Sequence, residues 1–297
     1  MDKNFRPYLA ELVGTFVVVF LGAGAVCMNT LAAVPWPADQ PSTLPVIQPE
    51  PGLLGIALVR GLALAVALAA TVHISGGYLN PAVTLMLWVY KRLDGFRTSM
   101  LIFVQLLGAA LAGGLLRLVF AFRIDSLASA HLGTPHLNLR AFGAAGLTGK
   151  ALFSGIGLEI ILTFILTFVI FATMIDPRAP RLLGRLGHWL SSLWVGLILA
   201  AITFVGTNFT GAAVNPARWF GTVIWEKTVP ALQLQQPFSD QMVFWIGPVL
   251  GALLAGGVYT TLILPSEEEH RPGHASPPPA GNKVSAGAGS TLFRSKK

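Results

Sequence analysis

Six stretches of this chain are apolar over about 20 residues each, the length of helix that spans the hydrocarbon of a bilayer. We expect membrane-spanning helices near residues 7–27, 52–72, 97–120, 151–175, 188–207 and 241–264. The composition agrees, because 54% of the chain is hydrophobic, 11% is charged and the mean hydropathy is +0.67. A soluble domain carries about 25% charged residues. The sequence therefore predicts an all-α membrane protein.

Lysine and arginine are unevenly distributed between the connecting segments. If both termini are cytoplasmic, 13 of the 20 basic residues lie on the cytoplasmic side, eight before or between the helices and five in the C-terminal segment. Cytoplasmic loops collect such residues. We therefore predict a multi-pass protein of a cell membrane, plasma or inner, with both termini inside. The net charge of +7 forms no basic patch, so we expect no nucleic-acid partner.

The two halves of the chain resemble each other in order and spacing. ELVGTF (11–16) parallels EIILTF (159–164), and LGAALAGG (107–114) parallels LGALLAGG (250–257). Such matched blocks indicate an internal duplication. Each half holds three predicted spans, an odd number, so the second half must enter the membrane from the opposite side.

This pattern predicts an inverted repeat, with one repeat at about 5–120 and the other at about 151–265. Together they make a channel domain over residues 1–265. Residues 266–297 are hydrophilic and rich in Pro, Gly and Ser, and we expect them to form a disordered cytoplasmic tail.

Each half also contains one Asn-Pro-Ala motif before a short apolar segment. The motifs are Asn80, Pro81 and Ala82 in the first half, and Asn215, Pro216 and Ala217 in the second. Asparagine caps helix N-termini and proline suits the first helical position. We expect two half-helices, near 81–90 and 216–225, that begin at membrane depth. Their N-terminal dipoles, each about +0.5 charge, would repel cations while the amides donate hydrogen bonds, as in a pore for small neutral molecules.

With HISGGYLNPAVT and TGAAVNPARWFG in these positions, the chain resembles the aquaporin (major intrinsic protein) family over about residues 5–265. The resemblance implies six tilted helices and two re-entrant half-helices in a homotetramer, with one cofactor-free pore per subunit. It makes Asn80 and Asn215 the pore asparagines. It makes Glu11 and Glu159 supports that bind the half-helix loops, and Arg218 an arginine of the outer selectivity filter.

The remaining filter positions implied by the resemblance are atypical. They are Arg60, Thr203 and Ala212. Arg60 has two alternative orientations, inward beside Arg218 or outward toward the membrane interface. Trp219 follows the filter arginine where glycerol-conducting members commonly have aspartate, which favours water. We predict a water channel that excludes protons and ions, with glycerol, ammonia or hydrogen peroxide as alternatives because of Arg60 and Thr203.

Other classes of protein are less consistent with the sequence. The histidines have no metal-ligand spacing and no nucleophile motif appears, so we expect neither an enzyme nor a metal site. A proton- or sodium-coupled transporter would need Glu11 and Glu159 as its coupling acids, and its flux would follow an ion gradient. A structural protein with a closed pore would show no flux. Cys27 is the single cysteine, and we expect it to be a buried packing residue.

Overall fold

A computed structural model of the chain describes residues 5–33, 52–123, 128–179, 187–229, 232 and 237–264. Within these ranges the chain is helical and contains no strand. The predicted disordered tail at 266–297 lies outside them.

All six predicted spans are present as long apolar helices. They are α1 (Arg6–Ala33), α2 (Gly52–Thr71), α4 (Gly95–Val119), α5 (Gly149–Ile170), α7 (Gly187–Thr210) and α9 (Gln241–Val258). Two of them continue into a π-helical turn, α5 at Phe171–Ile175 and α9 at Tyr259–Ile263. Two short 3₁₀ segments, Ala121–Arg123 and Ala128–Gly133, follow α4. The main difference from expectation is α1, which runs past residue 27 to Ala33.

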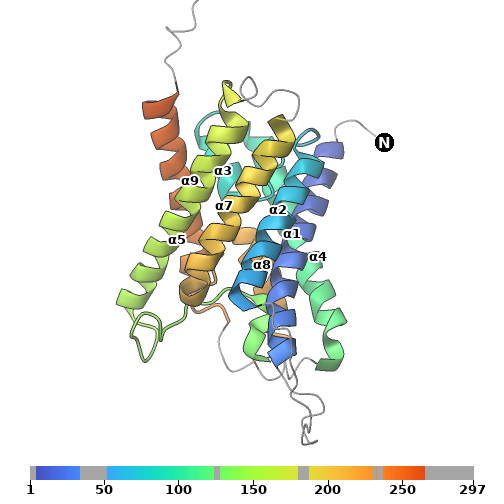
Figure 1. Cartoon of the computed structure of the whole chain (residues 1–297), viewed down its shortest axis with the longest axis vertical. Helices are drawn as coiled ribbons and strands as arrows, with labels where there is room; N and C mark the ends of the chain where they lie inside the picture. Colours follow the sequence, from blue (N-terminus) through green and yellow to red (C-terminus); the bar gives the residue numbers. More distant parts are fainter. Residues whose placement is uncertain are drawn as a thin grey trace, which may run out of the picture.

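The six long helices run along the vertical axis of Figure 1. The start of α1 and the end of α9 lie at the same end of the molecule, as an even number of spans requires. Their outer faces carry exposed apolar side chains, which a bilayer would cover. Examples are Leu62, Val66, Phe103, Phe153 and Phe204. The chain is an integral, multi-pass membrane protein.

Two short helices lie among the long ones, α3 (Pro81–Val89) and α8 (Pro216–Glu226). In each, the asparagine before the proline is extended and its side chain accepts a hydrogen bond from the third residue of the motif, Ala82 in α3 and Ala217 in α8. The predicted half-helices are thus confirmed, with caps of the expected kind.

Small residues let helices within each half approach closely, at equivalent positions of the repeat. Gly108 of α4 lies against the backbone carbonyl of Leu12 in α1. In the second half, Gly251 of α9 lies in the same way against the carbonyl of Ile160 in α5. The α1–α4 and α5–α9 pairs are therefore repeat equivalents, and the inverted repeat predicted from the sequence is present in three dimensions.

Candidate functional site

The two Asn-Pro-Ala motifs meet and bind one another. Asn80 Nδ2 donates to the carbonyl of Val214 at 2.8 Å, and Asn215 Nδ2 donates to the carbonyl of Leu79 at 2.9 Å. An amide nitrogen carries two hydrogens, so each asparagine keeps a second donor for a molecule beside it. The half-helix N-termini, with their positive partial charges, therefore converge on one point.

The residue before each asparagine has a left-handed backbone, with φ of 51° at Leu79 and 49° at Val214. For a residue other than glycine this conformation costs about 1–3 kcal/mol. It turns the two carbonyls toward the opposite asparagines, as the hydrogen bonds above show. Something in the surroundings must hold these loops in place.

The first loop is held by Glu11, which is completely buried. Its Oε1 accepts from the Tyr78 backbone at 2.9 Å and from Ser75 Oγ at 2.6 Å. Its Oε2 accepts from the Leu79 backbone at 2.7 Å and from Gln105 Nε2 at 2.8 Å. Bonds to a charged acceptor contribute about 1.5–3 kcal/mol each, enough to offset the strain at Leu79.

Glu159, also completely buried, repeats this arrangement in the second loop. Its Oε1 accepts from Thr210 Oγ1 at 2.6 Å and from the Ala213 backbone at 2.9 Å, and its Oε2 accepts from the Val214 backbone at 2.8 Å. Each glutamate therefore accepts the N–H groups of one loop and leaves the carbonyls facing the opposite side.

Of the two orientations open for Arg60, the structure shows the inward one. The side chain is buried, and its guanidinium donates to the carbonyl of Gly211 at 3.0 Å and to that of Ala212. The second loop is thus held from two sides, by Glu159 on its N–H groups and by Arg60 on its carbonyls. Val195, the repeat equivalent of Arg60, carries no donor, so this clamp breaks the pseudo-symmetry.

A narrow cavity runs past these groups and offers about 30 Å³ to the centres of water-sized molecules. Since about 10–15 Å³ of such space holds one water, it has room for roughly two. Polar lining comes from Tyr78, Asn80, Asn215, Arg60 and Arg218, and the rest is mainly apolar.

The other two predicted filter residues do not line this cavity. Thr203 is completely buried, and its hydroxyl has no partner among the described residues. Ala212 is also completely buried and contributes its carbonyl to Arg60. That Thr203 and Ala212 shape the filter stays a prediction.

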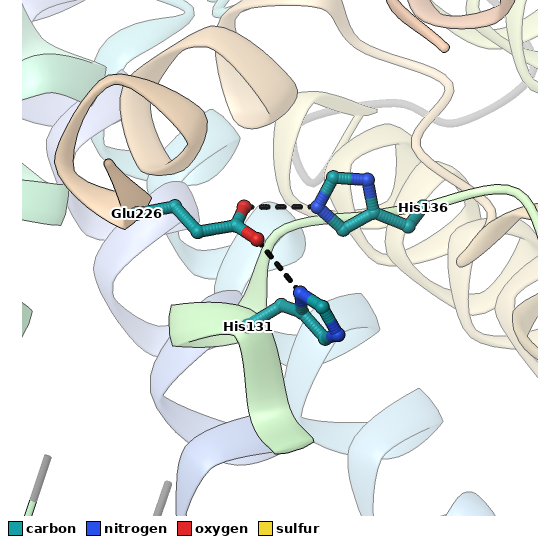
Figure 2. A group of neighbouring side chains, drawn as sticks. All are labelled: His131, His136 and Glu226. Atoms are coloured by element: carbon teal, nitrogen blue, oxygen red, sulfur yellow. Dashed lines mark hydrogen bonds and ion pairs between the residues drawn. The ribbon is translucent and has the colours of Figure 1, made fainter. Parts of the chain in front are cut away.

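Sequence reasoning missed a polar cluster of two histidines and two acids near this cavity. Figure 2 shows Glu226, at the end of α8, between His131 and His136 of the loop after α4. His131 Nδ1 lies 2.7 Å from Glu226 Oε1, and His136 Nε2 lies 2.9 Å from Oε2. Asp240 lies 3.1 Å from His136 Nδ1. Although burial lowers the pKa of His136, its hydrogen bonds to Asp240 and Glu226 raise that pKa to about 9. These residues are too far apart in sequence to form a recognisable motif.

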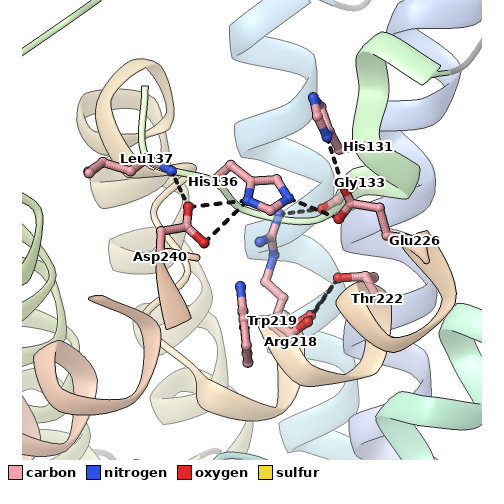
Figure 3. A network of polar contacts seen from close by, with 9 residues as sticks. All are labelled: His131, Gly133, His136, Leu137, Arg218, Trp219, Thr222, Glu226 and Asp240. Atoms are coloured by element: carbon pink, nitrogen blue, oxygen red, sulfur yellow. Dashed lines mark hydrogen bonds and ion pairs between the residues drawn. The ribbon is translucent and has the colours of Figure 1, made fainter. Parts of the chain in front are cut away.

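Arg218 connects this cluster to the cavity (Figure 3). Its Nη2 donates to the carbonyl of Gly133 at 3.5 Å, and Gly133 lies in the loop between the two histidines. Its Nε and Nη1 are buried with no partner among the described residues. Arg218 itself is one of the residues that line the cavity. Along α8, Thr222 hydrogen-bonds to the Arg218 carbonyl, and Glu226 follows one turn later on the same face.

Comparison with known proteins agrees with this geometry. Residues 2–259 match the family model described as major intrinsic protein. The Probable aquaporin TIP4-1 of Oryza sativa subsp. japonica is 37% identical over 259 residues, which are 87% of each chain. The Aquaporin TIP4-4 of Zea mays is 38% identical over 267 residues, which are 90% of each chain.

A solved structure shares the fold. The X-ray structure of the aquaglyceroporin from Plasmodium falciparum superposes with a TM-score of 0.68 at 24% sequence identity, covering 87% of this chain and 96% of that one. With the family model matched along most of its length, the chain belongs to the major intrinsic protein family.

Proposed function

We propose that the chain is a passive channel for water that excludes protons and other ions, and not an enzyme. The observation that carries the proposal is the reciprocal bonding of the Asn80 and Asn215 loops beside a cavity with room for roughly two waters. The named aquaporins among the relatives support a channel for water or a small solute.

The proposed mechanism follows from the donors on the cavity wall. Each asparagine offers its second N–H to the oxygen of a passing water, while the converging helix N-termini disfavour any cation. The guanidinium groups of Arg60 and Arg218 add positive charge to the same wall. A chain of waters that transmits protons would have to carry that charge past these groups.

We assign Arg60 and Arg218 to the selectivity filter, with different tasks. Arg218 has unpaired buried donors and can bind a permeating oxygen. Arg60 donates hydrogen bonds to the carbonyls of Gly211 and Ala212. These two acceptors are therefore occupied and are not available to a solute. The filter then offers mainly hydrogen-bond donors. This suits water and should disfavour the passage of larger polyols.

The assembly and the location are part of the same proposal. The exposed apolar faces of the long helices suit lipid and neighbouring copies, and we propose a homotetramer with a pore in each subunit. Native mass spectrometry of the purified protein measures this number directly. From the lysine and arginine distribution we propose a plasma or inner membrane with both termini in the cytoplasm.

Stopped-flow light scattering on proteoliposomes tests the function. After a sucrose step we expect native vesicles to shrink much faster than protein-free vesicles, with no added proton leak in a pH-sensitive dye assay. A glycerol step should show slow solute uptake. Shrinkage at the protein-free rate, with the protein folded and inserted, would contradict the proposal.

Arg60→Phe tests the filter assignment, with Arg140→Phe as the matched control because Arg140 is exposed in the loop before α5. We expect Arg60→Phe to alter the ratio of water to glycerol flux and Arg140→Phe to leave it unchanged. Equal ratios in all three proteins would place Arg60 outside the filter.

A further inference from the structure

We propose that His131, His136 and Glu226 form a binding site for a divalent transition metal at the mouth of the pore, with zinc as the preferred ion. The ligand atoms of these three residues all lie within 4.8 Å of one another (Figure 2). Two imidazole nitrogens and one carboxylate are ligands that zinc binds well, with an open fourth position for water.

The distances suit an ion after a small adjustment. A tetrahedral zinc ion with bonds of about 2.0–2.2 Å holds its ligand atoms roughly 3.3 Å apart. The two nitrogen–carboxylate contacts, at 2.7 and 2.9 Å, go to different oxygens of Glu226, so the side chains have to rotate until both nitrogens and one oxygen face the ion.

Asp240 orients one of the ligands. It lies 3.1 Å from His136 Nδ1 and accepts the backbone N–H of Leu137 at 2.8 Å. With a hydrogen on Nδ1 directed at this carboxylate, Nε2, the nitrogen beside Glu226, can bind an ion in place of its own proton. A carboxylate behind a histidine ligand is the usual way in which proteins fix the imidazole of a zinc site. Asp240 is therefore a positioning residue.

The buried carboxylates and the solvent exposure of the two histidines also favour a metal site. The Glu226 and Asp240 side chains are 1% and 6% exposed, so two carboxylates are buried together, and His136 between them supplies at most one positive charge. A divalent cation balances both. The His131 and His136 side chains are 32% and 22% exposed, which gives an ion a route from solvent.

The position of the site connects it to the channel. Gly133, which accepts from Arg218, lies on the loop between the two histidines, and Glu226 lies on the same face of α8 as Arg218 (Figure 3). A bound ion would therefore tie this loop to the end of the half-helix that carries the filter arginine.

Zinc binding to the full-length protein in detergent tests the proposal. The chain is purified without a polyhistidine tag, treated with EDTA, dialysed and titrated with Zn²⁺ in a calorimeter, while Mg²⁺ serves as the hard-cation comparison. We expect about one Zn²⁺ per chain and no comparable Mg²⁺ binding, because magnesium prefers oxygen ligands in an octahedral site.

Matched variants locate the ion. His131→Ala and the nearly isosteric Glu226→Gln should each weaken binding by more than about 100-fold, and Asp240→Asn by about 10- to 100-fold. His73→Ala, which changes an exposed histidine at the end of α2, should leave the affinity unchanged. Size-exclusion profiles and circular dichroism confirm that each variant is folded.

Three results would overturn the proposal. They are absence of tight binding in the native protein, affinity that survives both His131→Ala and Glu226→Gln, and loss of affinity when His270 and His274 of the tail are replaced instead. The titration needs no flux, so it stands apart from the channel assay. A site that binds zinc in a protein without water flux would refute the proposed function alone.

Discussion

Two matched glycines bring the backbones of the two halves of the pore into close approach. Gly61 and Gly196 occupy equivalent repeat positions, each 19 residues before a pore asparagine. In the structure they face each other across α2 and α7. A Cβ built on Gly61 would lie 2.5 Å from the Gly196 carbonyl oxygen and 2.8 Å from Ala200 Cβ. A Cβ on Gly196 would meet the Gly61 carbonyl at the same 2.5 Å.

Gly61→Ala should therefore destabilise the protein by a definite mechanism. An ordinary contact begins at about 3.4 Å, so the backbones of α2 and α7 have to separate by roughly 0.9 Å. The obstacle is backbone and not the end of a flexible side chain, so the separation cannot be avoided locally. Overpacking of this kind costs about 1–3 kcal/mol, which exceeds the gain of up to about 1 kcal/mol from replacing a helical glycine by alanine.

Thermal unfolding in detergent, followed by tryptophan fluorescence, measures this cost. We expect Gly61→Ala to lower the midpoint by roughly 2–10 °C. Gly157→Ala in α5 is the matched control, because a Cβ there has nothing within 4 Å. Its midpoint should stay the same or rise. If Gly61→Ala melts no lower than Gly157→Ala, the close approach of α2 and α7 does not limit stability and the reasoning fails.

Further predictions concern the site, an ion pair directly after the α5 span and the lone thiol. Micromolar Zn²⁺ should change osmotic water flux in native proteoliposomes but not in those with His131→Ala. An equal response in both would show that zinc bound at the histidine cluster does not affect water flux. Asp176→Asn should lower the free energy of unfolding by about 1–2 kcal/mol, because the Asp176 carboxylate accepts hydrogen bonds from Arg178 and Tyr259. The hydrogen bond from Arg178 holds the pKa of Asp176 at about 2, below its value in the unfolded chain. The difference in free energy of unfolding between the native protein and Asp176→Asn should therefore be complete above pH 4 and shrink toward pH 2. A difference that does not change with pH would contradict this. Mercuric chloride should leave flux unchanged because Cys27 is completely buried, and strong block that Cys27→Ser abolishes would show that the thiol is accessible.

Much of the architecture was predictable because it rests on local or periodic rules. Apolar length set the six spans, and an asparagine followed by a proline marked the start of each half-helix. The odd number of spans per repeat required inversion. Glu11 and Glu159 are buried and accept hydrogen bonds from the loops, and the supporting role that the family resemblance implied for them stays a prediction.

Two features of the site could not be read from the sequence. The orientation of Arg60 was open because its position in α2 is compatible with either the pore or the membrane interface. It was decided by two carbonyls of a loop about 150 residues away. The histidine cluster was missed because its members come from a loop and a half-helix about 90 residues apart.

The sequence by itself determined that this chain spans the membrane six times as an inverted repeat with two half-helices. Hydrophobic length and helix capping can be recognised within one stretch of the sequence, and the repeat by comparing two similar stretches. Only the tertiary structure decided which polar groups face one another inside it. Hydrogen bonds at the pore depend on positions accurate to a few tenths of an ångström, and such positions arise when Gly61 meets Gly196 and the two halves close around the cavity.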